Sequence, residues 1–248
     1  MPRPPSGRPT ATASAVARAL PRTLALAVAT ALVTLAAALP ADPAAAAGSH
    51  ASFRIGRLKY GGGGDWYGNQ TSLKNLHAGL RDRAGIPVEP GDATVVTPTD
   101  EALFNHPMLF MSGHGNVKFT PAEVERLRRW LNAGGFLWCD DDYGMADSFR
   151  REMKRVLPES ELVELPWSHP VFHQLYAFPR GLPKIHEHDG GPPKAFGAFH
   201  DGRLAVLFTF DTDIGDGLED AGVHSDPPEK REEALRMAIN VALFALSQ

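Results

Sequence analysis

The chain has 248 residues, 43% of them hydrophobic and 22% charged, with a formal net charge of −4 at pH 7. This composition excludes a disordered chain, and the lack of a basic excess argues against a nucleic-acid partner. Cys139 is the only cysteine, so an internal disulfide is excluded and stability must come from packing.

The first 47 residues have the layout of a Sec-type signal peptide. Four arginines precede an uncharged stretch at 24–39, and small residues follow up to Ala47. No adjacent arginine pair precedes that stretch, which argues against twin-arginine export. We expect cleavage near Ala47 and one exported domain at 48–248, periplasmic or extracellular, with a retained anchor as the alternative. The cleaved chain would carry 21 basic and 28 acidic side chains, so no membrane partner is expected.

Beyond this leader, apolar runs alternate with helical patterns, which predicts an α/β fold with a largely parallel sheet. A helix is expected from Thr71, with Leu73, Leu76 and Leu80 on one face. A short helical turn should separate the second and third of the early strands. These three strands are expected at 53–58, 93–96 and 108–112.

The segment TPAEVERLRRWLNAGG (120–135) is the clearest helix in the chain. Thr120 and Glu123 are spaced as a capping box, and Pro121 occupies the first helical position. Gly134 and Gly135 should end the helix.

The next segment, FLWCD (136–140), is nearly continuous in its hydrophobicity, as expected for a central parallel strand covered on both faces. Further elements are expected downstream, and the hairpin is predicted by its Asp201-Gly202 turn. The final helix is apolar almost all round from Ala238, so we expect it to be buried. These downstream elements are a helix at 147–156, a strand at 161–165, a hairpin at 195–210 and a helix from Pro227.

Polar residues follow four of the expected strands, at the edge where open parallel sheets bind ligands. Three consecutive carboxylates, at 140–142, repel one another unless they are paired or bound. We expect them to line a solvated cleft, with Asp140 and Asp142 pointing into it and Asp141 opposite. The expected ligand-binding residues are Asp65, Trp66, Ser112, Gly113, His114, Asp140, Asp142, Tyr143 and Asp211.

Each of these side chains also has a structural interpretation. Aspartates after strands often hydrogen-bond their own backbone, which is the alternative for Asp141 and Asp213. Trp66 beside Asp65 is either a stacking platform for a sugar ring or a rim aromatic. The glycine run at 61–64 does not match a dinucleotide or phosphate loop, so no nucleotide is expected.

The candidate catalytic residues are histidines and carboxylates rather than nucleophiles. His114 lies between two glycines that allow close backbone approach to a ligand. His169 is expected just after a Ser168 helix cap, where the helix dipole keeps the imidazole neutral, although it could merely satisfy backbone groups. Ser112 lacks a nucleophile elbow, and nearby carboxylates would suppress the Cys139 thiolate. The catalytic candidates are therefore His114, Asp140, Asp142 and His169.

A divalent metal is the open alternative for the same edge of the sheet. The sequence HEH places His186 and His188 on one face of a strand, a workable spacing for two metal ligands. A solvent-exposed pair beside a Gly-Pro loop is the competing interpretation. The candidate metal ligands are Asp140, Asp142, Asp211 and His188, with His114 and His169 as further donors.

The chain resembles the bacterial domain-of-unknown-function family numbered 4159, from about Phe53 to the C-terminus. The resemblance rests on GGDWY, LFMSGHG, LRRWLNAGGFLWCDDDYG, FRREM, LPWSHPVFHQLY and FTFDTDIG. It implies a three-layer α/β sandwich of the class I glutamine-amidotransferase-like, flavodoxin-related type, mostly parallel with an antiparallel hairpin. It implies no activity, and the sharp cysteine elbow of the amidotransferases has no counterpart here.

Three functions follow from these features. The first is an exported domain that binds a small polar ligand, of the glycan or cell-wall-fragment class. The second is a divalent-metal-assisted hydrolase that uses the Asp/His cluster. The third is an interaction module of the cell envelope. The sequence leaves the ligand, the metal and the oligomeric state open.

Overall fold

A computed structural model of the chain describes residues 52–188 and 190–248. The expected signal peptide at 1–47 lies outside the described residues. Among the helices that are described, none combines the length and apolar character needed to cross a membrane.

The fold is built on one seven-stranded sheet with the strand order β2-β1-β3-β4-β7-β6-β5. The pairings from β2 to β7 are parallel, whereas β6 runs antiparallel to both of its neighbours. The structure thus confirms an α/β fold with a mostly parallel sheet and an antiparallel hairpin. The strands are β1 (Ile55–Leu58), β2 (Val95–Val96), β3 (Met108–His114), β4 (Phe136–Tyr143), β5 (Val163–Glu164), β6 (Lys194–His200) and β7 (Arg203–Phe210).

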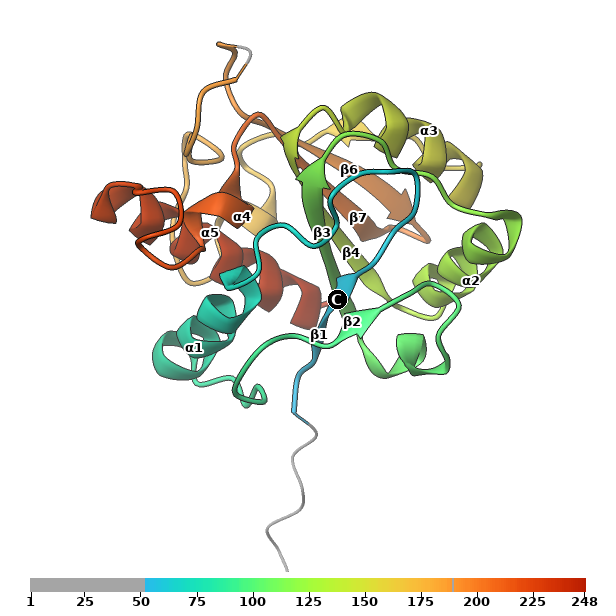
Figure 1. The fold of residues 1–248 in the computed structure, drawn as a ribbon, viewed down its shortest axis with the longest axis horizontal. Helices are drawn as coiled ribbons and strands as arrows, with labels where there is room; N and C mark the ends of the chain where they lie inside the picture. Colours follow the sequence, from blue (N-terminus) through green and yellow to red (C-terminus); the bar gives the residue numbers. More distant parts are fainter. Residues whose placement is uncertain (1–51, 189) are drawn as a thin grey trace, which may run out of the picture. The chain divides into compact units, whose positions relative to one another are not determined.

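Helices cover both faces of the sheet, so the described residues form three layers. One hydrophobic core lies between the sheet and helices α1 and α5, and the other between the sheet and helices α2 and α3 (Figure 1). Successive residues of β4 alternate between the cores, since Trp138 belongs to the first and Cys139 to the second. The helices are α1 (Ser72–Ala84), η2 (Glu101–Asn105), α2 (Pro121–Asn132), α3 (Ala146–Val156), η3 (Pro170–Phe172), α4 (Ile214–Gly217) and α5 (Pro228–Leu246).

Helix α2 begins as its sequence predicts. The Thr120 hydroxyl accepts a hydrogen bond from the Glu123 amide at 3.3 Å, and the Glu123 carboxylate accepts one from the Thr120 amide at 2.7 Å. The predicted capping box is therefore confirmed. At the far end of the helix, Trp130 Nε1 donates to the His106 carbonyl at 2.9 Å, which ties α2 to the start of β3.

The carboxyl ends of β1, β3, β4 and β7 lie at one edge of the sheet because these strands are parallel. The loops after them run at 59–71, 115–120, 144–145 and 211–213. The β6–β7 hairpin turn lies at the opposite edge. The four polar segments singled out from the sequence are thus brought to a common edge.

Candidate functional site

The three aspartates at the end of β4 are buried, with at most 2% of each residue exposed. The expectation that these three side chains are solvated is therefore wrong, although Asp141 and Asp142 still border a cavity. The cause is tertiary: the loop before α1 and the turn into α4 fold over the end of β4 and supply hydrogen-bond donors to its carboxylates. Each aspartate has a different set of partners.

Asp140 fastens the turn into α4 to the end of β4. Its Oδ2 accepts a hydrogen bond from the Gly215 amide at 2.6 Å, and its Oδ1 accepts one from the Thr209 hydroxyl. The Thr209 hydroxyl oxygen in turn accepts from Trp138 Nε1 at 3.0 Å. Burial nevertheless raises the pKa of Asp140 to about 8. Asp140 thus positions a loop and is not among the residues that line the cavity beside these aspartates.

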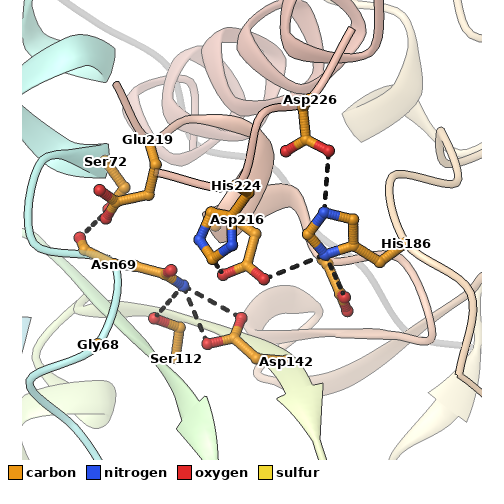
Figure 2. A network of polar contacts seen from close by, with 12 residues as sticks. Gly68, Asn69, Ser72, Ser112, Asp142, His186, Asp216, Glu219, His224 and Asp226 are labelled. Atoms are coloured by element: carbon orange, nitrogen blue, oxygen red, sulfur yellow. Dashed lines mark hydrogen bonds and ion pairs between the residues drawn. The ribbon is translucent and has the colours of Figure 1, made fainter. Parts of the chain in front are cut away.

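Asp142 is held by one amide from the loop before α1. The Asn69 amide nitrogen donates to both oxygens of Asp142, at 3.1 and 2.9 Å, and to the Ser112 hydroxyl at 3.0 Å (Figure 2). Asn69 lies in the left-handed region with φ = 54°, and its carbonyl accepts from Arg57 and Ser72, both at 2.7 Å. Burial, followed by the charges of neighbouring aspartates, raises the pKa of Asp142 well above its ordinary value.

Asp141 points to the opposite side of the strand, as the alternation predicts, and contacts the start of helix α3, but it lines the cavity beside these aspartates, so the expectation that it would face away from the site is wrong. Its Oδ1 accepts a hydrogen bond from the Met145 amide at 2.9 Å. Its Oδ2 is buried and accepts none from the described residues. Burial raises the pKa of Asp141 to about 6, despite the hydrogen bond from the helix. This carboxylate therefore has one oxygen bonded to the protein and one buried oxygen without a partner among the described residues.

Beside these aspartates lies a cavity of about 240 Å³. The Tyr143 ring, from a residue 51% exposed, contacts the imidazole of His188 with 4.9 Å between ring centroids. No lysine or arginine is among the described residues that line this cavity. The lining residues are Asp141, Asp142, Tyr143, Gly144, Ala146, Asp147, His188, Phe210 and Asp211.

His114 is oriented by Asp65 at the end of β3. The two oxygens of Asp65 contact the backbone amide and Nδ1 of His114, the latter at 3.1 Å. The His114 side chain is 52% exposed, and the residue pairs with Tyr143 in the sheet register. Gly113 is required here because a Cβ atom would lie 2.6 Å from the Asp65 carboxylate and from the Tyr60 hydroxyl. Gly113 thus makes room for Asp65.

Trp66 and Ser112 do not line the cavity. The Trp66 ring packs at the edge of a hydrophobic core, with the Lys59 ammonium 5.0 Å from its centroid, as the rim interpretation holds. Ser112 accepts the hydrogen bond from Asn69.

His169 lies away from this edge, contrary to its proposed place in the Asp/His cluster. It is itself the cap of η3, and its Nδ1 accepts from the Val171 amide at 3.2 Å. Its ring lies 6.3 Å from that of Phe199, which pairs with Leu204 at the start of β7. Because Asp211 follows the opposite end of β7, His169 cannot join the carboxyl-edge residues.

A cluster of histidines and aspartates forms where residues 186–188 meet the turn after β7. His186 Nδ1 lies 3.1 Å from an oxygen of Asp213. It also lies 3.1 Å from an oxygen of Asp216 (Figure 2). His186 Nε2 lies 2.9 Å from Asp226, and His188 Nε2 contacts the same Asp213 oxygen. These carboxylates, Asp213 first, raise the pKa of His186 to about 11.

Two groups of three side chains in this cluster could hold a metal ion. The donor atoms of His186, His188 and Asp213 lie within 4.8 Å of one another, as do those of His186, Asp216 and His224. The HEH spacing predicts the first two of these residues as a possible ligand pair. For Asp213 the sequence pattern favours a structural turn. It gives no sign that Asp216 or His224 belongs to the cluster, although Asp213 and Asp216 both lie in the segment DTDIGD (211–216).

Of the four metal ligands expected from the sequence, only His188 belongs to such a group among the described residues. Asp140 and Asp142 accept hydrogen bonds from the protein instead. Asp211 lies 2.6 Å from the Lys184 ammonium through Oδ1 and lines the cavity. The sequence placed these residues at the correct edge but did not resolve which carboxylates face the histidines.

We predict that Asp141→Asn makes the protein more stable at alkaline pH. A carboxyl whose folded pKa is raised stabilises the fold below its ordinary pKa, and this contribution is lost as the pH rises through about 6. The difference in free energy of unfolding between variant and wild type should therefore shift in favour of the variant by about 2 kcal/mol between pH 4 and pH 8. Urea unfolding at both pH values measures it.

The matched control for this prediction is Asp147→Asn, since Asp147 lines the same cavity but is exposed. The change in free energy of unfolding with pH that is specific to Asp141→Asn is the part that exceeds the change seen for this control. A difference that is independent of pH for Asp141→Asn would contradict a raised pKa for this carboxyl.

Comparison with known proteins identifies a family without assigning an activity. No curated protein matches the chain. The family model described as a domain of unknown function, DUF4159, matches residues 54–246, which include every strand and helix of the described fold. The polar edge, the cavity and the histidine cluster all lie within the matched range. The chain therefore belongs to the DUF4159 family.

Proposed function

We propose that this chain binds a small, hydroxyl-rich ligand of the glycan or cell-wall-fragment class in the cavity at the carboxyl edge of the sheet. The observation that carries this proposal is the lining of the cavity: four aspartates and the exposed ring of Tyr143, with no lysine or arginine among the described lining residues. Carboxylates accept hydrogen bonds from hydroxyl groups, and an aromatic face packs against the apolar face of a sugar ring.

The size and charge of the cavity narrow the ligand further. Its volume of about 240 Å³ is below the roughly 300–1,000 Å³ of sites for drug-sized ligands, which favours a single ring. Lys184 pairs with Asp211 at the edge of the cavity, but no described lysine or arginine lines it, and this acidic lining disfavours a phosphate, so a nucleotide is a poor ligand.

Titration of the protein with N-acetylglucosamine tests this proposal, with binding followed by NMR or calorimetry in the presence of a chelator. Tyr143→Ala should weaken binding about fivefold, because a stacked ring contributes about 1 kcal/mol. Tyr67→Ala is the matched control, since Tyr67 is similarly exposed but does not line the cavity. N-acetylglucosamine 6-phosphate should bind more weakly than the neutral sugar. Equal affinity in both variants, or preference for the phosphorylated sugar, would sink the proposed site.

A second candidate function is hydrolysis of the bound ligand with the help of a divalent metal. Two observations favour it. Asp65 orients His114 so that its Nε2 is available for proton transfer, and a histidine cluster adjoins the cavity through His188. Hydrolysis would require the ligand's scissile bond to lie between them.

We also propose that the fold is of the class I glutamine-amidotransferase-like type, without the chemistry of that superfamily. The three layers and the parallel core from β2 to β7 support the kinship. Cys139 is fully buried within β4, and burial, followed by the adjacent aspartates, raises the pKa of its thiol well above the ordinary value. A thiolate nucleophile is therefore not part of the proposal. Residues 1–47 would deliver the domain outside the cytoplasm, where glycans and cell-wall fragments occur.

A further inference from the structure

We infer that His186, His188 and Asp213 form a binding site for a divalent metal ion of the zinc type, bordered by Asp216 and His224. This inference deepens the second candidate function. Binding of the ion is measurable with no sugar present, so the two proposals can fail separately.

The spacing of the donor atoms fits a common ion. Ligands that each lie about 2.0–2.2 Å from zinc are separated from one another by roughly 3–3.5 Å. His186 Nδ1 lies 3.1 Å from Asp213 Oδ2 and 3.1 Å from Asp216 Oδ2, and the donor atoms of His186, His188 and Asp213 all lie within 4.8 Å. Small movements would bring these atoms to ligand distance around one centre.

The hydrogen bonding within the cluster is incomplete without a cation. Asp213 is fully buried, and its Oδ1 accepts no hydrogen bond from any described residue. The single hydrogen of His186 Nδ1 faces carboxylate oxygens of both Asp213 and Asp216 at equal distance. A buried carboxylate with an unused oxygen is costly, and metal coordination is one of the few arrangements that stabilises it.

Two segments distant in sequence are held together to form this site. The Ile185 amide donates to the Thr212 carbonyl at 2.9 Å, and the Thr212 hydroxyl donates to the Pro183 carbonyl, immediately beside the donors. Asp213 itself lies in the left-handed region with φ = 58°. A non-glycine residue in this region is retained where the surrounding structure requires its side chain in that place.

Asp226 supplies a second observation that is typical of metal sites. Its carboxylate lies 2.9 Å from His186 Nε2, the ring nitrogen that faces away from Asp213. Histidine ligands commonly donate their remaining N–H group to a carboxylate, which fixes the ring and makes the coordinating nitrogen more basic. In this arrangement His186 would coordinate through Nδ1 and donate from Nε2 to Asp226.

The donor set selects the class of metal. Imidazole nitrogens with a carboxylate suit zinc and its first-row neighbours, whereas Mg²⁺ and Ca²⁺ prefer oxygen ligands throughout. His188 also lines the cavity, so the bound ion would border the proposed ligand site. A coordination position open toward the cavity would bind water or a ligand hydroxyl.

Titration of chelator-treated, full-length protein with Zn²⁺ alone tests the inference, with Mg²⁺ and Ca²⁺ as comparison ions. One zinc ion per chain should bind with a dissociation constant below about 1 µM, and the comparison ions should bind far more weakly. Loss of a residue that only orients a metal-coordinating side chain lowers metal affinity about 10–100-fold. His188→Asn and Asp213→Asn remove coordinating side chains, so each should weaken zinc binding at least about 100-fold. Asparagine suits Asp213 because it tolerates the left-handed region.

His200→Asn is the matched control, since His200 also neighbours an aspartate but lies in the hairpin at the opposite edge of the sheet. Circular dichroism of all variants without metal shows whether each is folded. Substitution with Co²⁺ gives a second readout, because visible absorption bands report nitrogen and oxygen ligands directly. Zinc binding that is lost in the two cluster variants and kept in His200→Asn supports the site. No zinc binding by wild type, or equal binding by all four proteins, overturns it.

Discussion

Replacing Asp140 by alanine at pH 5 is expected to lower the free energy of unfolding by about 3 kcal/mol. The substitution leaves the buried Gly215 amide without its acceptor and the Thr209 hydroxyl with only the Cys139 carbonyl at 3.3 Å, and it creates a small cavity. Each unsatisfied buried donor costs about 1–3 kcal/mol. Chemical denaturation of the metal-free protein measures the loss.

The effect of Asp140→Ala should shrink as the pH rises. The folded pKa of Asp140 is raised above its ordinary value, so the stability contributed by this carboxyl is present below about pH 4 and is lost as the pH rises through about 8. A destabilisation that grows toward pH 8 would contradict this assignment. The variant should also lose zinc binding, because Gly215 lies between Asp213 and Asp216 in the loop that Asp140 holds. Thr209→Val, which removes one of the two donors to Asp140, should show a smaller loss of both properties.

Replacing Asn69 by alanine is expected to have a similar effect on stability, about 3 kcal/mol at pH 7. The substitution removes the donor to both oxygens of buried Asp142 and to Ser112, and it places alanine in the left-handed region. The unpaired groups cost about 1–3 kcal/mol and the backbone strain roughly another 1 kcal/mol. Thermal or urea unfolding gives the change in free energy.

Asn69→Gly separates these two causes, because glycine adopts the left-handed region without strain. It should recover roughly 1 kcal/mol of the loss caused by alanine. If alanine and glycine are equally destabilising, the strain at φ = 54° contributes nothing. If neither variant is destabilised, Asn69 is not the partner that Asp142 requires.

The regular elements of the fold were accessible from the sequence because each depends on local chemistry. The capping box at Thr120 and Glu123, the Asp201-Gly202 turn and the apolar run of β4 all act within a few residues. The common polar edge followed as well, since parallel strands must bring their carboxyl ends to the same side.

The details of the site depended on contacts that no local pattern encodes. Asn69 reaches Asp142 from 73 positions away, and His186 reaches Asp213 from 27. The alternation along β4 correctly predicts that the Asp141 side chain points to the face opposite those of Asp140 and Asp142. It does not predict which face the loops cover, because tertiary packing decides that. The prediction that His169 lies at the polar edge was wrong, because the pattern of a helix cap followed by a proline does not indicate at which edge of the sheet the helix begins.

The three adjacent aspartates thus divide their tasks between structure and ligand. Asp140 holds the loop that carries Asp213 and Asp216 through the Gly215 amide. Asp141 and Asp142 border the cavity. Asp141 also accepts a hydrogen bond from the Met145 amide, and Asp142 accepts hydrogen bonds from the Asn69 side chain. Repulsion among them is relieved by donors from other segments, and a cation bound at the proposed metal site would relieve it further.

The most direct test of the metal site is an anomalous difference map at the zinc absorption edge from a crystal grown with Zn²⁺. We predict one dominant peak, about 2.0–2.2 Å from His186 Nδ1, His188 Nε2 and the Asp213 carboxylate. A zinc-saturated crystal with no peak at these three residues, or with its peak on other side chains, would contradict the proposed coordination.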